Sequence, residues 1–300
     1  MKRLMLIAVP VRILLALFLL RPAGTPEAPT LQATPEPTAA ATASPEPTPL
    51  PAPAPSQTFV TEYPATDYAT GEQIVKKLAV YLPEGYIPGK SYPAVMLMHV
   101  SGADETFWLN LGIQEIMDEL TANGEIPPTL VFMPDGYAGE EKRGARNDPG
   151  IYTQFAAELR NDLMPFLREY YGISENRGDL AFYGASFGAY LCVNSVLIPN
   201  LDLFSGFGYV GGGTIDLSSL LSGWEDSGTA GLPIKLLYIG EGSFDDRGPV
   251  ELSYLTLLNH CDSFSDANLK FSLMENVGHD PEEWTRGLRE FLPLFFSSEG

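Results

Sequence analysis

Short apolar runs alternate with longer amphipathic segments along the chain, from about residue 77 to its end. Uninterrupted apolar runs are typical of strands buried on both faces, and apolar residues at three- and four-residue steps are typical of helices. The alternation predicts an α/β fold in which helices flank a mostly parallel central sheet. The expected strands are 77–82, 94–100, 129–134, 179–184, 204–210, 234–240 and 269–275, and the expected helices are 110–124, 152–172, 187–198, 250–261 and 282–296.

The segment 151–171 shows a helical period. Its apolar side chains recur at three- and four-residue steps, so one face is expected to be buried. Gly172 is expected to end the helix, because glycine readily adopts the left-handed conformation found after a helix C-terminus. Its acids Glu158 and Asp162 are expected on the solvated face, without a catalytic role.

The first 58 residues differ in composition from the rest. Residues 1–20 put two basic residues ahead of an apolar stretch, which is the layout of a signal peptide or a signal anchor. Residues 21–58 are rich in Pro, Ala and Thr and hold too little apolar surface to fold, so we expect a disordered, extended linker. Residues 59–300 then form the folded domain. This order predicts an exported protein, extracellular or tethered to the cell surface, that meets a membrane only through an uncleaved N-terminal segment.

Charge and cysteine content narrow the partners. The chain has a net charge of −20 at pH 7, and this argues against nucleic acid as a partner. Cys192 and Cys261 could form one disulfide in an exported protein, but Cys192 falls in an apolar helix, where a buried free thiol fits equally well. The three histidines have no Cys or His at metal-ligand spacing, so no metal and no other cofactor is expected. The sequence does not indicate an oligomeric state.

A strand-to-helix turn in "YGASFGAY" is the strongest candidate for chemistry. Its G-x-S-x-G spacing, from Gly184 to Gly188, puts Ser186 after an expected strand and before an expected helix, which is the context of a nucleophile elbow. The amide of Phe187 would open the helix without a helical acceptor, so it can donate to a developing oxyanion. The same letters also fit a close-packed turn that needs small residues.

A serine nucleophile needs a base that accepts its proton. His279 lies directly after the last expected strand and before the last expected helix. His99 precedes the elbow, and His260 lies within an amphipathic helix, where a packed or surface histidine is the ordinary interpretation. The position of His279 therefore favours it as the base for Ser186.

An acid between the serine and the histidine should orient the base. The loop after the expected strand 234–240 offers Glu241, Asp245 and Asp246. Parallel strands bring their carboxyl ends to one edge of a sheet, so a residue of this loop can meet His279 there. The alternative is an ordinary turn with solvated acids.

Several segments resemble those of a known family. They are "YLPEGYIPGKSYPAVMLMHVSGADETFW", "VFMPDG", "ELRNDLMPFLREYYGI", "YGASFGAY" and "GHDPEEWTRGLREFLPLFF". From about Leu78 to Phe296 the chain thus resembles the putative-esterase branch of the α/β-hydrolases, which includes esterase D, feruloyl esterases, enterochelin esterases and mycolyltransferases. The resemblance implies an α/β-hydrolase fold. In the family the acid follows a Gly-x-x-Asp step, which corresponds to Gly242 to Asp245 and favours Asp245 over Asp246.

The resemblance also implies a second oxyanion donor near Ser101, in addition to the amide of Phe187. Val100 stands where the family has glycine. A β-branched residue does not easily adopt a glycine-only backbone conformation, so this half of the oxyanion hole is expected to differ. His99 and Trp108 are candidates to line the substrate pocket.

The implied activity is that of a serine carboxylic-ester hydrolase working through an acyl-enzyme. Feruloyl or acetyl esters of plant cell-wall polysaccharide are the favoured substrates. Acyl transfer and hydrolysis of a siderophore ester are the alternatives within the family. A surface-tethered binding protein without turnover is the alternative outside the enzymes, and Val100 is the feature that favours it.

Overall fold

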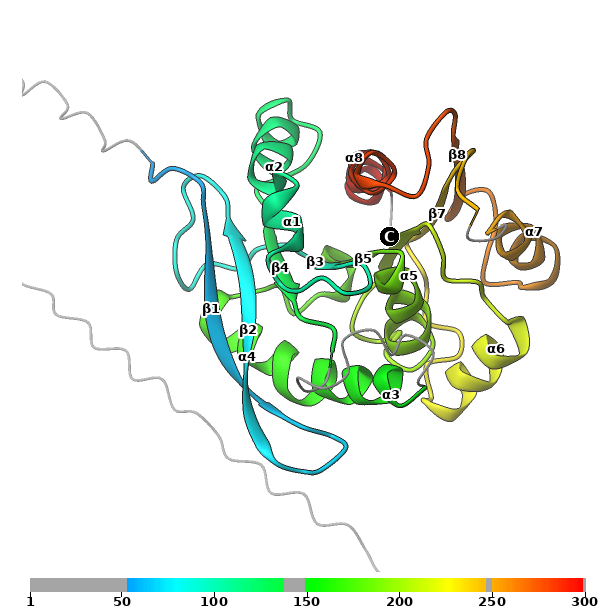
Figure 1. The fold of residues 1–300 in the computed structure, drawn as a ribbon, viewed down its shortest axis with the longest axis horizontal. Helices are drawn as coiled ribbons and strands as arrows, with labels where there is room; N and C mark the ends of the chain where they lie inside the picture. Colours follow the sequence, from blue (N-terminus) through cyan, green and yellow to red (C-terminus); the bar gives the residue numbers. More distant parts are fainter. Residues whose placement is uncertain (1–52, 138–148, 247–249, 299–300) are drawn as a thin grey trace, which may run out of the picture. The chain divides into compact units, whose positions relative to one another are not determined.

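A computed structural model describes residues 53–137, 149–246 and 250–298 of the chain. At its centre lies an eight-stranded sheet with the order β1-β2-β4-β3-β5-β6-β7-β8 (Figure 1). The strands are β1 (Gln57–Thr66), β2 (Gln73–Leu82), β3 (Ala94–Met98), β4 (Leu130–Pro134), β5 (Leu180–Ala185), β6 (Gly206–Val210), β7 (Leu236–Gly242) and β8 (Leu269–Met274).

The direction of the strands divides the sheet into two parts. β1 and β2 form an antiparallel pair from Gln57 opposite Leu82 to Thr66 opposite Gln73, and β2 also runs antiparallel to β4. The neighbours from β4 across to β8 are all parallel. These parallel strands end at one common edge, and loops that follow them can bring distant residues together there.

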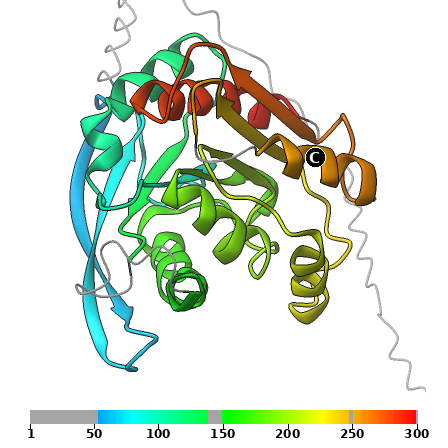
Figure 2. The same cartoon turned by 45° about the vertical axis from the view of Figure 1, so that its right-hand side comes forward.

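Helices cover both faces of the sheet (Figures 1 and 2). The helices α1, α2 and α8 pack on one face, and the helices α3 to α7 contribute to the core on the other. Two π-helical turns, Leu159–Leu163 and Cys192–Leu197, continue α3 and α5. The helices are α1 (Phe107–Asn110), α2 (Ile113–Ala122), α3 (Pro149–Glu158), α4 (Met164–Tyr171), α5 (Phe187–Leu191), α6 (Leu217–Asp226), α7 (Glu251–His260) and α8 (Pro281–Ser297).

Strand β2 shows why the apolar runs are uninterrupted. Its residues Leu78 and Val80 belong to the core under α3 to α7, while Ala79 and Tyr81 belong to the core under α1, α2 and α8. Side chains alternate between the two faces of a strand. A strand covered on both faces therefore needs apolar residues at every position, and each fully buried large apolar side chain contributes about 1.5–3 kcal/mol.

The expected fold class is confirmed, and the expected strands and helices occur in the predicted order. Gly172 ends α4 with φ 67°. The strand β1, the short helix α1 and the helix α6 were not predicted. The expected domain boundary at Phe59 falls inside β1. The sequence did not indicate this strand, because it lies at the edge of the sheet, is largely exposed or half-buried and lacks an apolar run.

The structure covers only part of what was expected for an exported chain. Residues 1–20 and most of 21–58 lie outside the described residues, so the signal segment and the linker stay predictions. Within the described ranges, no helix combines the length and the apolar character needed to cross a bilayer. Cys192 and Cys261 are both buried and both free. Of the two alternatives for this pair, the structure therefore has buried free thiols and not a disulfide.

Candidate active site

Ser186 lies at the sharp turn between β5 and α5. Its backbone has φ 53° and ψ −110°, a region that residues other than glycine rarely adopt. The amide of Ser186 donates to the carbonyl of Val210 at the end of β6 (3.0 Å). This turn aims the serine side chain across the carboxyl edge of the sheet, as a nucleophile elbow does.

The two glycines of the elbow are required by packing. A Cβ on Gly184 would lie 2.0 Å from the carbonyl oxygen of Gly188, and a Cβ on Gly188 would lie 2.6 Å from the carbonyl oxygen of Met98. Both contacts are closer than any side chain allows. Close packing therefore explains why the G-x-S-x-G spacing has glycine at both ends. The strained backbone conformation lies at Ser186 between them.

His279 connects the serine to an acid. Its Nε2 lies 2.9 Å from Oγ of Ser186, and its Nδ1 lies 2.9 Å from Oδ2 of Asp245. A carboxylate only accepts hydrogen bonds, so Nδ1 donates to Asp245 and Nε2 is free to accept from the serine hydroxyl. Asp245 comes from the loop after β7, and its side chain is 2% exposed, against 13% for His279. The structure thus brings together Ser186, His279 and Asp245, and not Asp246 or Glu241, as the bonded set.

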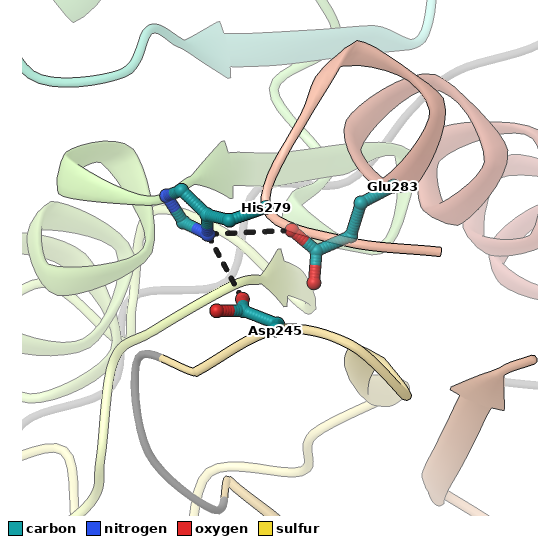
Figure 3. Close-up of side chains that lie close together, drawn as sticks. All are labelled: Asp245, His279 and Glu283. Atoms are coloured by element: carbon teal, nitrogen blue, oxygen red, sulfur yellow. Dashed lines mark hydrogen bonds and ion pairs between the residues drawn. The ribbon is translucent and has the colours of Figure 1, made fainter. Parts of the chain in front are cut away.

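A second carboxyl group points at the same ring nitrogen. Glu283, in the first turn of α8, has Oε2 at 3.5 Å from Nδ1 of His279 and is fully buried (Figure 3). Its other oxygen accepts from the amide of Gly242 (2.9 Å). Asp245, His279 and Glu283 offer ligand atoms within 4.8 Å of one another, so they are also the described residues that could hold a metal ion.

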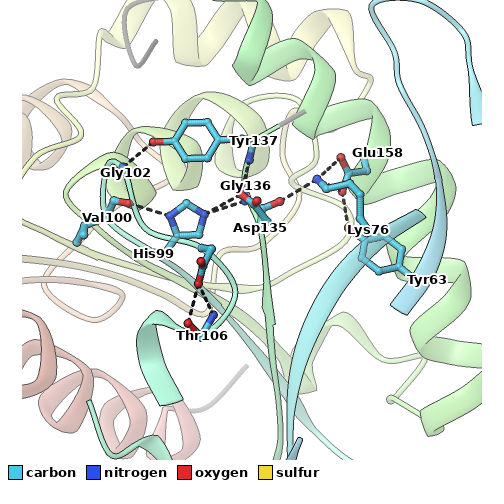
Figure 4. Close-up of polar contacts among 11 residues, drawn as sticks. Tyr63, Lys76, His99, Val100, Gly102, Thr106, Asp135, Gly136, Tyr137 and Glu158 are labelled. Atoms are coloured by element: carbon cyan, nitrogen blue, oxygen red, sulfur yellow. Dashed lines mark hydrogen bonds and ion pairs between the residues drawn. The ribbon is translucent and has the colours of Figure 1, made fainter. Parts of the chain in front are cut away.

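A buried histidine orients the loop that follows β3 (Figure 4). Nδ1 of His99 donates to the carbonyl of Val100 (2.8 Å), and the amide of Gly136 donates to Nε2 (2.9 Å). Oδ1 of Asp135 lies 3.2 Å from the same Nε2, so the ring is held at both nitrogens. The carbonyl of Val100 and the amide of Ser101 belong to one trans peptide and point in opposite directions. His99 therefore turns the Ser101 amide away from itself.

Val100 does not carry the unusual backbone conformation in this loop. Among the described residues other than glycine, only Ser186 and Asn276 have positive φ, and the loop takes its positive φ at Gly102 (79°). The amide of Gly102 donates to the hydroxyl of Tyr137 (2.9 Å). Val100 therefore does not have to adopt a glycine-only backbone conformation, because Gly102, two residues later, has the positive φ.

Tyr137 and Phe187 form a stacked pair with ring centroids 4.7 Å apart, and both pack against His99. All three side chains are at most 2% exposed. Trp108 is fully buried in the core under α1, α2 and α8. His99 and Trp108 were expected to line the pocket. Instead, His99 supports the loop from behind, and Trp108 is a core residue.

A buried ion pair lies behind this loop. Nζ of Lys76 contacts both carboxylate oxygens of Glu158 at 2.8 Å and donates to the carbonyl of Asp135 (2.8 Å). The hydroxyl of Tyr63 donates to the same carboxylate. The expectation that Glu158 is solvated was wrong, because its partners come from β1 and β2, far away in the sequence. This cluster anchors the start of the segment Asp135 to Tyr137.

Comparisons with known proteins agree with this geometry. Residues 73–211 match the model of a family described as "Putative esterase". The chain belongs to this esterase family. Its fold is that of a feruloyl esterase module from Clostridium thermocellum complexed with sinapinate, with a TM-score of 0.66, 23% identity, and coverage of 84% of this chain and 91% of that chain.

Two curated relatives of this esterase-family chain are larger proteins. The endo-1,4-beta-xylanase/feruloyl esterase of Xylanibacter ruminicola is 32% identical over 72% of this chain and 29% of its own length. Endo-1,4-beta-xylanase Y of Acetivibrio thermocellus is 33% identical over 46% of this chain and 13% of its own length. The chain thus spans less than a third of either relative.

Sequence reasoning missed Glu283 and Gly211 in this esterase-family site. Gly211 follows β6 with φ 66°, and a Cβ on it would lie 2.7 Å from Oε2 of Glu283 and 2.9 Å from the ring of His279. Glu283 stands in "GHDPEEW", where acids at the start of a helix are ordinary. Only its four-residue step from His279 could have indicated that the two side chains lie close together.

Proposed function

We propose that the chain is a serine carboxylic-ester hydrolase that works through an acyl-enzyme. Ser186 attacks the ester carbonyl while His279 accepts its proton, and Asp245 holds the ring and stabilises the imidazolium that forms. His279 then gives the proton to the departing alcohol. Water, activated by the same base, releases the acid and restores Ser186. The bonded chain from Ser186 through His279 to Asp245 is the observation that carries this proposal.

Two backbone amides complete the proposed mechanism. The amide of Phe187 is the first of α5 and has no acceptor within the helix. The amide of Ser101 is turned outward by the bond between His99 and Val100. Two donors that converge on the carbonyl oxygen stabilise the tetrahedral oxyanion, and one such donor contributes about 2.7–4 kcal/mol to the transition state.

We further propose esters of ferulate or related acids on plant cell-wall polysaccharide as substrates. Support comes from the xylanase/feruloyl esterase relative and from the feruloyl esterase module complexed with sinapinate. Export of the chain belongs to the same proposal, because residues 1–20 have the layout of an export signal.

The test compares the wild type with Ser186→Ala on methyl ferulate, acetylated xylan and a siderophore triester, together with labelling by a fluorophosphonate. We expect methyl ferulate to be the best substrate, and we expect Ser186→Ala to lose about 10⁴-fold or more in kcat and all labelling. Ser222→Ala, at an exposed serine of α6, is the matched control and should leave both unchanged.

Two outcomes contradict the proposal. An unlabelled wild type that hydrolyses none of the esters would favour a binding protein on a hydrolase scaffold. Loss of activity on treatment with a chelator would instead favour a metal held by Asp245, His279 and Glu283. We expect a chelator to have no effect.

A further inference from the structure

Glu283 is a buried acid that lacks a cationic partner of its own. No lysine or arginine of the described residues forms an ion pair with it, and the nearest ionisable nitrogen is Nδ1 of His279. The other ionisable groups that face it are Asp245 from the loop after β7, Asp280 at the start of α8 and Tyr183 from β5. A carboxylate in such surroundings is unfavourable, because burial and negative neighbours both disfavour its charge.

The surroundings raise the pKa of Glu283 to about 8. Burial is the largest cause, the hydrogen bond from the amide of Gly242 opposes it, and the charge of Asp245 adds to it. The side chains of Glu283 and Asp245 also contact each other. Two carboxylates have no proton to share, so this contact becomes a hydrogen bond only when one of them is protonated.

The side chain of Glu283 does not serve its own helix. A glutamate three residues after an N-cap commonly bonds back to the amide of the N-cap residue. Here the N-cap is Asp280, whose amide donates to the carbonyl of Gly278, and Glu283 reaches across to Gly242 on β7. Gly211 leaves room for it, since any Cβ there would collide with its Oε2.

We propose that Glu283 is a positioning residue for the catalytic histidine: as a neutral acid it donates to the Asp245 carboxylate and holds Asp245 and His279 in line. One carboxyl oxygen fixes the group to β7 through Gly242, and the other carries the proton to Asp245. The acid loop and the base are thereby tied to the first turn of α8. This inference rests on the proposed function of Ser186, His279 and Asp245.

The first test separates a hydrogen-bonding role from a space-filling one. Glu283→Gln keeps an acceptor for Gly242 and a donor for Asp245, whereas Glu283→Leu keeps only similar bulk. We expect Glu283→Leu to lower kcat by about 10- to 100-fold with KM changed by less than about 3-fold, because a displaced base loses its alignment. Glu283→Gln should retain kcat within about 3-fold, and Glu282→Gln, at an exposed neighbour, should match the wild type.

The pH profile of Glu283→Gln tests the charge state. If Glu283 is neutral while His279 titrates, the acid limb of kcat/KM stays where it is in the wild type. A shift of that limb to lower pH would mean that the substitution removed a negative charge beside His279. That shift, or equal losses in Glu283→Gln and Glu283→Leu, would overturn the proposal.

A third test uses the absence of Asp245. In Asp245→Asn the charge that opposes ionisation of Glu283 is gone, so Glu283 becomes the only carboxylate that faces Nδ1 of His279. We expect Asp245→Asn to retain about 10-fold more activity than the double variant Asp245→Asn/Glu283→Gln. Equal activities of the single and the double variant would contradict a role of Glu283 at the histidine.

An infrared measurement makes the inference testable apart from the esterase activity. The wild type at neutral pH should show the carbonyl band of a protonated carboxyl group, and Glu283→Gln should lack it. A missing band in the wild type would overturn the inference even in an active enzyme. A wild type that shows the band but neither hydrolyses esters nor reacts with a fluorophosphonate would instead refute the proposed function.

Discussion

Glu158 and Glu283 are both buried glutamates, and they have opposite surroundings. Glu158 is held by Lys76 through two contacts of 2.8 Å, and Glu283 faces Asp245 and His279. Burial is the largest cause that raises the pKa of each. Lys76 opposes this rise for Glu158, whereas Asp245 increases it for Glu283. The fold thus uses glutamate in two ways. Glu158 forms a fixed ion pair behind the site, and Glu283 holds a proton within the site.

The ion pair gives the largest expected effect. Lys76→Met removes the cation and leaves the buried Glu158 with the hydroxyl of Tyr63 as its remaining hydrogen-bond partner among the described residues, which we expect to lower the free energy of unfolding by about 3–5 kcal/mol. Urea unfolding measures this, with Lys77→Met at the exposed neighbouring position as the matched control. A loss in Lys76→Met no greater than that in Lys77→Met would show that Glu158 does not depend on its cation.

The next largest effect is expected at Gly211, which leaves space for Glu283. Gly211→Ala would push a Cβ against Glu283 and His279, and we expect kcat for an aryl ester to fall by about 10-fold or more. Gly228→Ala is a matched control, because Gly228 has φ 69° and nothing within 4 Å of an added Cβ. Both variants incur the backbone strain, so only the collision distinguishes them. Equal kcat values would mean that this side of the site tolerates displacement.

The pH dependence of stability gives the last expected effect. A group whose pKa is raised in the folded state stabilises the fold while it is protonated, and that stability is lost as the pH rises from its ordinary pKa through its folded pKa. For Glu283 the upper end of this window is about pH 8. We therefore expect the wild type to lose more stability than Glu283→Gln between about pH 5.5 and about pH 8.5, by up to about 3 kcal/mol. Urea midpoints at the two pH values measure it, and parallel losses would contradict the raised pKa.

Patterns that repeat locally predicted much of the fold and part of the site. The parallel strands β3 to β7 are buried almost throughout, so their apolar runs are visible in the sequence. Ser186 follows β5, Asp245 follows β7, and His279 follows the less buried edge strand β8. β1 was missed because an edge strand needs no such run.

The residues that sequence reasoning misplaced depend on contacts between distant segments. Glu158 lies 82 residues from Lys76, and no periodic pattern reports such a pair. Glu283 resembles an ordinary acid at a helix start, and only the approach of Gly242 and Gly211 gives it a different role. Trp108 is an aromatic residue in a segment that resembles the family, but its burial follows from how α1 packs on the sheet.

The backbone of Ser186 also bears on how this chain could change over generations. A residue with a β-carbon at φ 53° and ψ −110° costs on the order of 1–3 kcal/mol relative to one that adopts this conformation freely. Replacing Ser186 by glycine would remove that cost, and this change needs only a single substitution. A chain that only bound its ligand would gain stability from that change and lose nothing. The serine at this position is therefore what we expect of a lineage in which turnover, and not stability, decides which variants persist.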